Sequence, residues 1–149
     1  MQQLSKAVEV KWLKGAVANA SNTDDASAIV DTQGFDGVMF VASLIDSANT
    51  GVAQLIVEQN TANSATGMAA LTGMTAQATS AADDDLNGKL LVADVYRPME
   101  RYVRVKRKSA TANIAFGDVL AILYHGRMKP PVWAGAASVV AAASPGEAA

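Results

Sequence analysis

Short apolar runs separated by clusters of turn residues recur along this chain, and their spacing limits the possible folds more than any other feature. Many runs alternate apolar and polar side chains, and Asp, Asn, Ser, Thr and Gly gather between them about every ten residues. Alternation places successive side chains on opposite faces of a strand. The sequence therefore predicts an all-β fold, an antiparallel β-sandwich or jelly roll with extended N- and C-terminal arms.

Several segments have the pattern expected of strands. They are residues 8–12, 27–31, 35–45, 52–59, 74–79, 89–95, 101–108 and 119–124, with a weaker strand at 15–20 and one helical turn at 67–71. We expect 35–45 and 52–59 to pair as a hairpin, and 101–108 and 119–124 to pair and close the sandwich. Residues 119–124 (V-L-A-I-L-Y) are apolar on both faces, as expected of a strand in a sheet that is covered on both sides.

The length of 149 residues suits one folded domain with flanking segments. Residues 1–14 are expected to form an N-terminal arm or strand, residues 15–129 the β-sandwich domain, and residues 130–149 an extended C-terminal arm. Pro130 and Pro131 mark the last boundary, because proline is excluded from the interior of a sheet.

The predicted C-terminal arm is rich in alanine and carries apolar side chains that a solvated segment does not need, namely Trp133, Val139 and Val140. We expect it to become ordered on a partner. The alternative is a disordered tail, since a segment of this composition buries too little surface by itself to offset the entropy of ordering.

Composition and motifs exclude several kinds of site. The chain has no cysteine and one histidine, His125, which excludes disulfides, thiolate metal sites and a zinc site built from several histidines. No glycine motif for phosphate is present, and no nucleophile is paired with His125 in the sequence. Residues 83–85, three consecutive aspartates, lack the spacing of a calcium loop and are expected to be a solvated turn. We therefore predict no enzymatic activity, no catalytic residues, no cofactor and no metal.

No segment suits a membrane or a signal peptide. The longest nearly apolar run, residues 132–143, is shorter than the ~20 residues that span a bilayer. The first ten residues lack a basic region followed by an apolar core. We expect a protein made in a cytoplasm, with no membrane partner.

Charge is divided unevenly along the chain. Residues 1–95 hold four bases and eleven acids, whereas residues 96–149 hold eight bases and three acids. Such a division can mark a nucleic-acid surface. Nucleic-acid binders usually carry net positive charge and interleaved aromatics, whereas this chain has a net charge of −2 and only Tyr102 within its basic run. We expect the basic face of residues 101–108 to meet acidic protein groups rather than nucleic acid.

Three segments carry a family resemblance: D-T-Q-G-F (31–35), R-Y-V-R-V (101–105) and T-A-N-I-A-F-G-D-V-L-A-I-L-Y-H-G-R-M-K-P-P (111–131). In this order they resemble small head proteins of tailed bacteriophages. The resemblance covers about residues 27–131. It implies a β-sandwich that decorates and cements the capsid shell, commonly as a homotrimer on the major capsid protein. Residues 60–88 and the alanine-rich tail are not part of the pattern.

The resemblance implies a structural virion protein on the capsid surface that bridges neighbouring major capsid subunits and has no small-molecule substrate. We expect the contacts to come from exposed apolar, basic and proline residues. The expected partner-binding residues are Trp12, Arg101, Arg104, Lys106, Arg127, Pro130, Pro131, Trp133, Val139 and Val140. The alternative is a phage tail or fibre-associated module that binds a host-surface ligand, which would need an aromatic-lined pocket.

Overall fold

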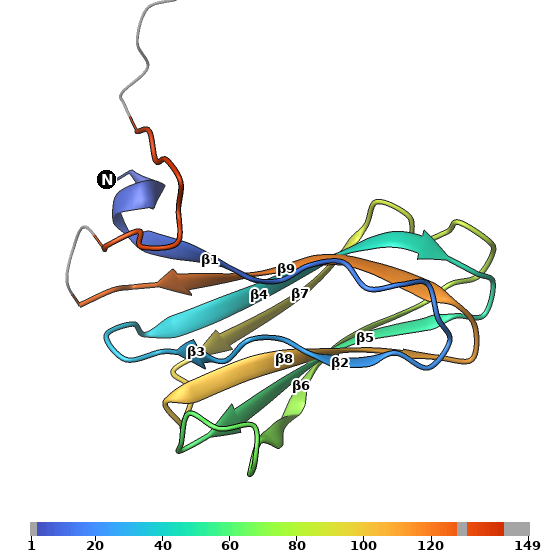
Figure 1. Ribbon diagram of the computed structural model, residues 1–149, viewed down its shortest axis with the longest axis horizontal. Coiled ribbons are helices and arrows are strands. Elements are labelled where there is room, and N and C mark those ends of the chain that lie inside the picture. The colour runs from blue at the N-terminus through green and yellow to red at the C-terminus, as the bar shows by residue number, and fades with distance from the viewer. Residues whose placement is uncertain (1–2, 128–130, 142–149) are drawn as a thin grey trace, which may run out of the picture.

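Two antiparallel sheets pack face to face in this computed structural model, which describes residues 3–127 and 131–141 (Figure 1). A short 3-10 helix, η1 (Leu4–Lys6), precedes the first strand. The strands are β1 (Val8–Lys14), β2 (Asp24–Ala26), β3 (Val30–Asp31), β4 (Gly37–Ser47), β5 (Val52–Asn60), β6 (Ala69–Thr79), β7 (Leu90–Tyr96), β8 (Tyr102–Ala110) and β9 (Ile114–Tyr124). In the described part of the chain, no helix is long and apolar enough to cross a membrane.

The strand order is that of a jelly roll. Sheet A has the order β1-β9-β4-β7, and sheet B has the order β2-β8-β5-β6, with the short β3 also paired with β8. The chain repeatedly crosses from one sheet to the other, so that β4 and β5, β6 and β7, and β8 and β9 lie in opposite sheets. The predicted all-β antiparallel sandwich is confirmed, and its jelly-roll form follows from these crossings.

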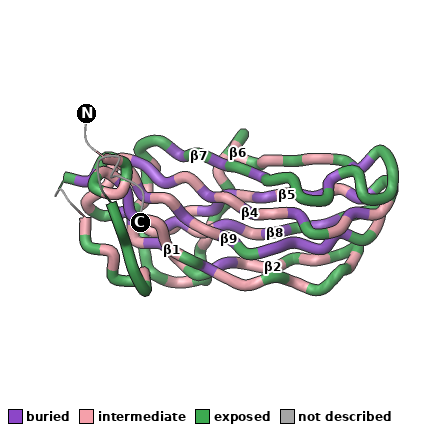
Figure 2. Tube along the Cα trace, turned by 90° about the horizontal axis from the view of Figure 1, so that it is seen from above, coloured by how far each residue is buried: buried purple, intermediate pink, exposed green. Residues whose placement is uncertain are grey.

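The core lies between the sheets and is built from alternate residues of each strand. Figure 2 shows the alternation as buried segments separated by partly buried ones along the strands. The fully covered apolar side chains include Val38, Phe40, Ala42, Leu55, Val57, Val103, Val105, Phe116, Val119, Ala121 and Leu123. Because the side-chain period of a strand is two, burying one set commits the other set to the outer face of its sheet.

Two predicted strand pairings are wrong. β4 pairs with β7 and β9, and β5 pairs with β6 and β8, so residues 35–45 and 52–59 do not form a hairpin. β8 and β9 likewise lie in different sheets, and their inward faces meet across the core. Alternation identifies the faces of a strand, but long-range packing chooses its neighbours.

Four local predictions also change. Residues 67–71 are not a helical turn, because Ala69 begins β6, whose pairing with β5 is irregular near Gly73 (φ 78°). Residues 15–20 make one isolated bridge, from Ala20 to Ile114. Of the strand expected at 27–31, only Val30–Asp31 is a strand (β3), and the Ser27 hydroxyl between β2 and β3 accepts a hydrogen bond from the Val105 amide. β9 begins at Ile114, five residues before the predicted start.

Candidate protein-interaction surfaces

The outer face of sheet A is apolar across all four strands. The register places Trp12 of β1 beside Leu120 of β9, Leu120 beside Val41 of β4, and Val41 beside Val92 of β7. We call the apolar side chains of this surface the apolar face: Val10, Trp12, Met39, Val41, Ile45, Leu90, Val92, Leu120 and Ile122. Trp12 is 61% exposed and Leu90 is 58% exposed. The cover expected over both faces of residues 119–124 is therefore present on only one face within the described chain.

Two carboxylates of this surface each accept a hydrogen bond from an aromatic side chain of the same surface. The indole N–H of Trp12 donates to Asp118 at 3.0 Å. The hydroxyl of Tyr124 donates to Asp94 at 2.6 Å. Burial, together with the hydrogen bond to Asp94, raises the pKa of Tyr124 well above its usual value. Polar side chains thus border the apolar face, and two of their carboxylates accept hydrogen bonds from within the chain.

Gly37 makes the Tyr124 contact possible. Gly37 lies on β4, opposite Tyr124 in the ladder, and a side-chain Cβ at this position would overlap the phenol ring. The ring can therefore lie across β4 and reach Asp94 on β7. A glycine usually weakens a strand. At Gly37, the missing side chain leaves room for the ring of Tyr124 to lie against the backbone of β4.

A second surface lies at the end of the sandwich where the two terminal segments meet. Residues 131–141 run beside η1 and the start of β1 (Figure 1). The indole N–H of Trp133 donates to the carbonyl oxygen of Ser5 at 2.9 Å. Around this anchor Leu4, Val132 and Val140 are 73%, 80% and 89% exposed. We call this surface the terminal end.

Open hollows lie beside the terminal end, and one of about 390 Å³ is bordered by Glu9, Lys11 and Trp12 of β1 together with Ala134 and Gly135. The loops after β3 and β7 border an open hollow of about 310 Å³. Its lining residues are Thr32, Gln33, Gly34, Phe35, Pro98, Met99, Glu100, Arg101 and Arg127. Phe35 is the one aromatic residue among them, so this hollow is not the aromatic-lined pocket that recognition of a host-surface ligand would need.

Two outward cations of β8, and Arg101 just before this strand, are paired with acids of neighbouring strands. Arg101 binds Asp31 through both ends of its guanidinium at 2.8 Å, and this hydrogen bonding lowers the pKa of the carboxyl group. The two other outward pairs are Arg104 with Glu58 at 2.7 Å and Lys106 with Asp24 at 2.8 Å. Three of the eight bases in residues 96–149 are thus paired with acids of sheet B.

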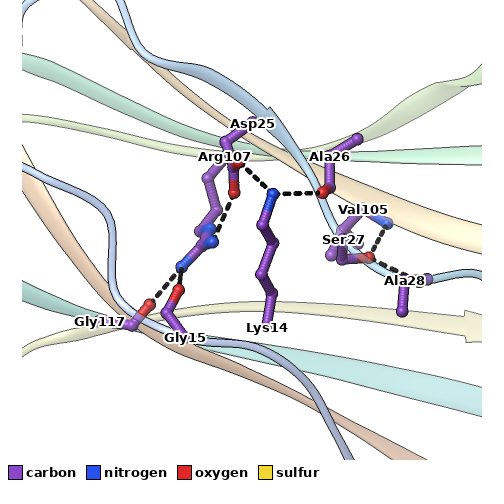
Figure 3. A network of polar contacts seen from close by, with 9 residues as sticks. All are labelled: Lys14, Gly15, Asp25, Ala26, Ser27, Ala28, Val105, Arg107 and Gly117. Carbon is purple, nitrogen blue, oxygen red and sulfur yellow. Dashed lines mark hydrogen bonds and ion pairs between the residues drawn. The ribbon is translucent and has the colours of Figure 1, made fainter.

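Arg107 differs from the other β8 cations because it points into the core, where it is 1% exposed (Figure 3). Its Nη1 donates to the carbonyl oxygens of Gly15 at 2.8 Å and Gly117 at 2.6 Å, and its Nη2 binds Asp25. Lys14 also binds Asp25. Burial acts to raise the pKa of Asp25, but the hydrogen bonds from Lys14 and Arg107 outweigh it and lower the pKa. Arg107 therefore ties β8 and β2 of sheet B to β9 of sheet A.

The predicted partner-binding residues do not form one surface. Trp12 lies on the apolar face, whereas Arg101, Arg104 and Lys106 belong to the sheet B ion pairs. The remainder, Arg127, Pro131, Trp133, Val139 and Val140, follow β9 or lie in the segment at the terminal end. Pro130 lies outside the described residues.

Sequence reasoning missed most of the apolar face. Its outward residues on β4 and β7, such as Val41 and Val92, were not among the expected contacts. The signal was present, since residues 35–45 and 119–124 are apolar on both alternating faces. Sequence reasoning also missed Arg107. The signal was again present, since Arg107 alternates in phase with Val103 and Val105 and therefore shares their inward face.

The described residues contain no group of three or more His, Cys, Asp or Glu arranged to hold a metal ion. Residues 83–85 form part of a loop, in which Asp83 accepts from the amide of Asn49 at 2.8 Å and Asp85 from the amide of Ala81 at 3.0 Å. His125 is exposed, and its ring meets that of Tyr124 edge to face at 5.3 Å.

Comparison with known proteins adds little. No family model and no curated protein sequence matches the chain. Among solved structures, Eiger TNF from S. frugiperda aligns with 85% of this chain and 98% of its own, with a TM-score of 0.44 and 7% sequence identity. A likeness this distant carries no argument about function or partners.

Proposed function

We propose that this chain is a non-enzymatic structural protein of a tailed bacteriophage that decorates the capsid surface and bridges neighbouring major capsid subunits. The observation that carries the proposal is the convergence of the three segments that resemble phage head proteins. Thr32 donates from its amide to the carbonyl oxygen of Arg101 at 2.9 Å, and the Arg127 amide donates to the carbonyl oxygen of Gly34 at 2.8 Å. All three segments thus contribute to the terminal end.

The terminal end has features that suit attachment to a large protein lattice. Trp133 holds the start of the C-terminal segment against the domain, so less ordering entropy is lost when the segment meets a partner. Beyond this anchor, Val139 and Val140 expose apolar surface that a neighbouring subunit can cover. A protein that binds only the assembled lattice stabilises that lattice by mass action.

Truncation tests this proposal directly. Deleting residues 131–149 should lower occupancy on purified shells by at least about tenfold, because each buried valine contributes about 1.5 kcal/mol or more. The domain should stay folded, since the core residues all precede this segment. Occupancy can be measured by quantitative gel analysis of sedimented particles, and folding by circular dichroism.

Substitutions within the C-terminal segment test whether its exposed valines, and not the whole segment, are needed for occupancy. Val139→Ser with Val140→Ser should reduce occupancy, while Ala137→Ser, also at an exposed position, should leave it unchanged. Unchanged occupancy and heat resistance of shells carrying the truncated protein would refute attachment through this segment. Binding of the purified protein to host cells or glycans would instead support the alternative of a host-recognition module.

A further inference from the structure

We infer that the free edge of β7 binds an extended segment of another protein, which joins the four strands of sheet A as a further strand. The inference goes beyond capsid attachment, which we place at the terminal end. It rests on three properties of this edge: its unpaired backbone groups, its lack of the protection that the other edges have, and the hollow beside it.

The ends of the ladder between β4 and β7 fix which backbone groups of β7 point away from the sheet. The Arg97 amide donates to the carbonyl oxygen of Asp36 at 2.7 Å, and the Leu44 amide donates to the carbonyl oxygen of Lys89 at 2.9 Å. Bonded and non-bonded residues alternate along an antiparallel pair, and the register between these two ends is unbroken. The odd-numbered residues of β7 therefore bond to β4, and the backbone groups of the even-numbered residues point outward: Leu90, Val92, Asp94 and Tyr96. Among the described residues, no other strand pairs with this edge.

The other edges of the two sheets carry features that discourage pairing with a foreign strand. β1 has three charged side chains, and residues 131–141 run beside its start (Figure 1). β2 is three residues long and includes two aspartates, and its Ala26 carbonyl oxygen accepts from Lys14 at 3.2 Å. β6 is irregular near Gly73, where its register with β5 shifts. By contrast, the seven residues of β7 follow β4 without a shift, and Asp94 is the one charged residue among them.

A hollow beside the edge has room for a side chain of the added strand. β7 and β6 lie along the same side of the sandwich (Figure 2), and an open hollow of about 150 Å³ is lined by residues 73–76 of β6 and residues 92–94 of β7. No heavy atom lies within 4 Å of the place where a Cβ on Gly73 would project. An extended segment points alternate side chains to the two faces of its sheet. One apolar side chain of a segment paired with β7 can therefore fill this hollow.

The same hollow favours a segment that belongs to no folded sheet over the β7 edge of a second copy. The inward side chains of β7, those of Leu91, Ala93 and Val95, are 5%, 5% and 7% exposed because they pack in the core. A second copy paired edge to edge would keep these side chains in its own core and leave both hollows empty. A free segment has both sets of side chains available, one for the hollow and one to continue the apolar face.

The side chains along the edge set the chemistry of the segment. Its outer side chains would lie beside Leu90, Val92 and Tyr96, which are 58%, 46% and 58% exposed, so apolar side chains are favoured there. Asp94 lies on the same face, and a cation on the neighbouring strand would attract it. We expect a segment about as long as the seven residues of β7, with apolar residues and a lysine or arginine beside Asp94. It should lack proline, which removes a donor from the ladder.

Hydrogen exchange of the full-length chain with a bound peptide tests the inference. The probes are random peptides of about nine residues, within the usual range of strand lengths, selected for binding to the immobilised wild-type chain. With the site about nine-tenths occupied, exchange should slow about tenfold at the amides that point outward, because only the free chain exchanges there. The amides of Leu91, Ala93 and Val95 already bond to β4 and should not change. This alternation along one strand is specific to strand addition.

A matched pair of variants locates the binding on the backbone of β7. Val92→Pro removes an outward amide that makes no bond to β4, so the domain should fold, since proline is tolerated on an edge strand. The variant should bind the selected peptides at least about tenfold more weakly, because one hydrogen bond is lost and the ring obstructs the added strand. The control is Val92→Thr, which keeps the amide and should bind within about twofold of the wild type.

Three results would overturn the inference. They are a selection that yields no peptide with a dissociation constant below about 1 mM, selected peptides that bind Val92→Pro as tightly as the wild type, and exchange that does not alternate along β7. Slower exchange at the outward amides of the chain alone, increasing with its concentration, would place a second copy on the edge and refute a free segment. If Val92→Pro does not fold, the exchange pattern of the wild-type chain decides by itself. These measurements use no shells, so they fail or succeed independently of capsid attachment.

Discussion

The outer faces of the two sheets differ in their charged side chains. Sheet B places Arg104 and Lys106 outward, each beside a carboxylate of a neighbouring strand, and a Gln54–Gln77 hydrogen bond of 2.6 Å continues this polar surface. Sheet A places apolar side chains outward on all four strands. Inside the molecule sheet B contributes the buried Arg107, and sheet A contributes mostly apolar side chains together with the buried Glu9 and Ser47.

The chain therefore has one sheet with ion pairs on its outer face and one sheet whose outer face is largely apolar. Lys106–Asp24 is the more exposed of these two ion pairs, and exposed pairs typically contribute about 0–1 kcal/mol each but keep a surface hydrated and discourage unplanned association. Apolar side chains on an outer face contribute to a single copy mainly through contacts between neighbouring strands, and large exposed apolar patches favour association. The predictions below test that contrast, beginning with the largest expected effect.

Replacing Arg107 with methionine should cost about 3–5 kcal/mol of unfolding free energy, because it removes one partner of a buried ion pair. It would also leave the carbonyl groups of Gly15 and Gly117 without their donor. Chemical denaturation monitored by circular dichroism measures the loss.

The control is Lys108→Met, one residue further along β8 at an exposed position, which should change stability by no more than about 0.5 kcal/mol. If Arg107→Met were as stable as the wild type, the buried cation would be dispensable, and the two sheets would differ only on their outer faces.

Replacing Gly37 with alanine should cost about 1–3 kcal/mol, because the added methyl group overlaps the ring of Tyr124 and forces it off the sheet. Displacing the ring also breaks its hydrogen bond to Asp94. Thermal unfolding measures the cost.

Gly15→Ala is the matched change at an open site, where the nearest heavy atom to the new Cβ is Trp12 Cζ2 at 3.5 Å, an ordinary contact. It should be nearly neutral. Equal effects at the two positions would mean that the loss comes from general strand flexibility and not from the Tyr124 contact.

Acid should weaken the fold through Asp25. The folded-state pKa of Asp25 is lowered, so its contribution to stability is complete above the unfolded value of about 3.9 and is lost as pH falls through the folded pKa. Asp25→Asn should therefore be less stable at pH 7 but lose less on further acidification.

Denaturation midpoints measured at intervals between neutral pH and the acid range check this prediction. Parallel pH profiles for the wild type and Asp25→Asn would show that Asp25 does not control acid stability.

Much of the fold followed from local pattern. The sequence predicted a basic face for residues 101–108, and the structure places Arg104 and Lys106 outward and Val103 and Val105 inward, because the side-chain period of a strand is fixed by the backbone. The strands at 35–45, 52–59 and 89–95 were located to within about two residues, a normal uncertainty for element ends. β6 was not recognised in full, since alanine, threonine and glycine give little alternation to detect.

The sequence by itself determined which side chains share a face, and the absence of cysteine chemistry. Only the tertiary structure decided which faces meet. Arg107 and Asp25 are 82 positions apart, and they become partners only because β2 pairs with β8. Trp12, Val41, Val92 and Leu120 form one row only because β1, β9, β4 and β7 lie side by side. Periodicity is a property of neighbouring residues, whereas strand order results from the packing of the whole core.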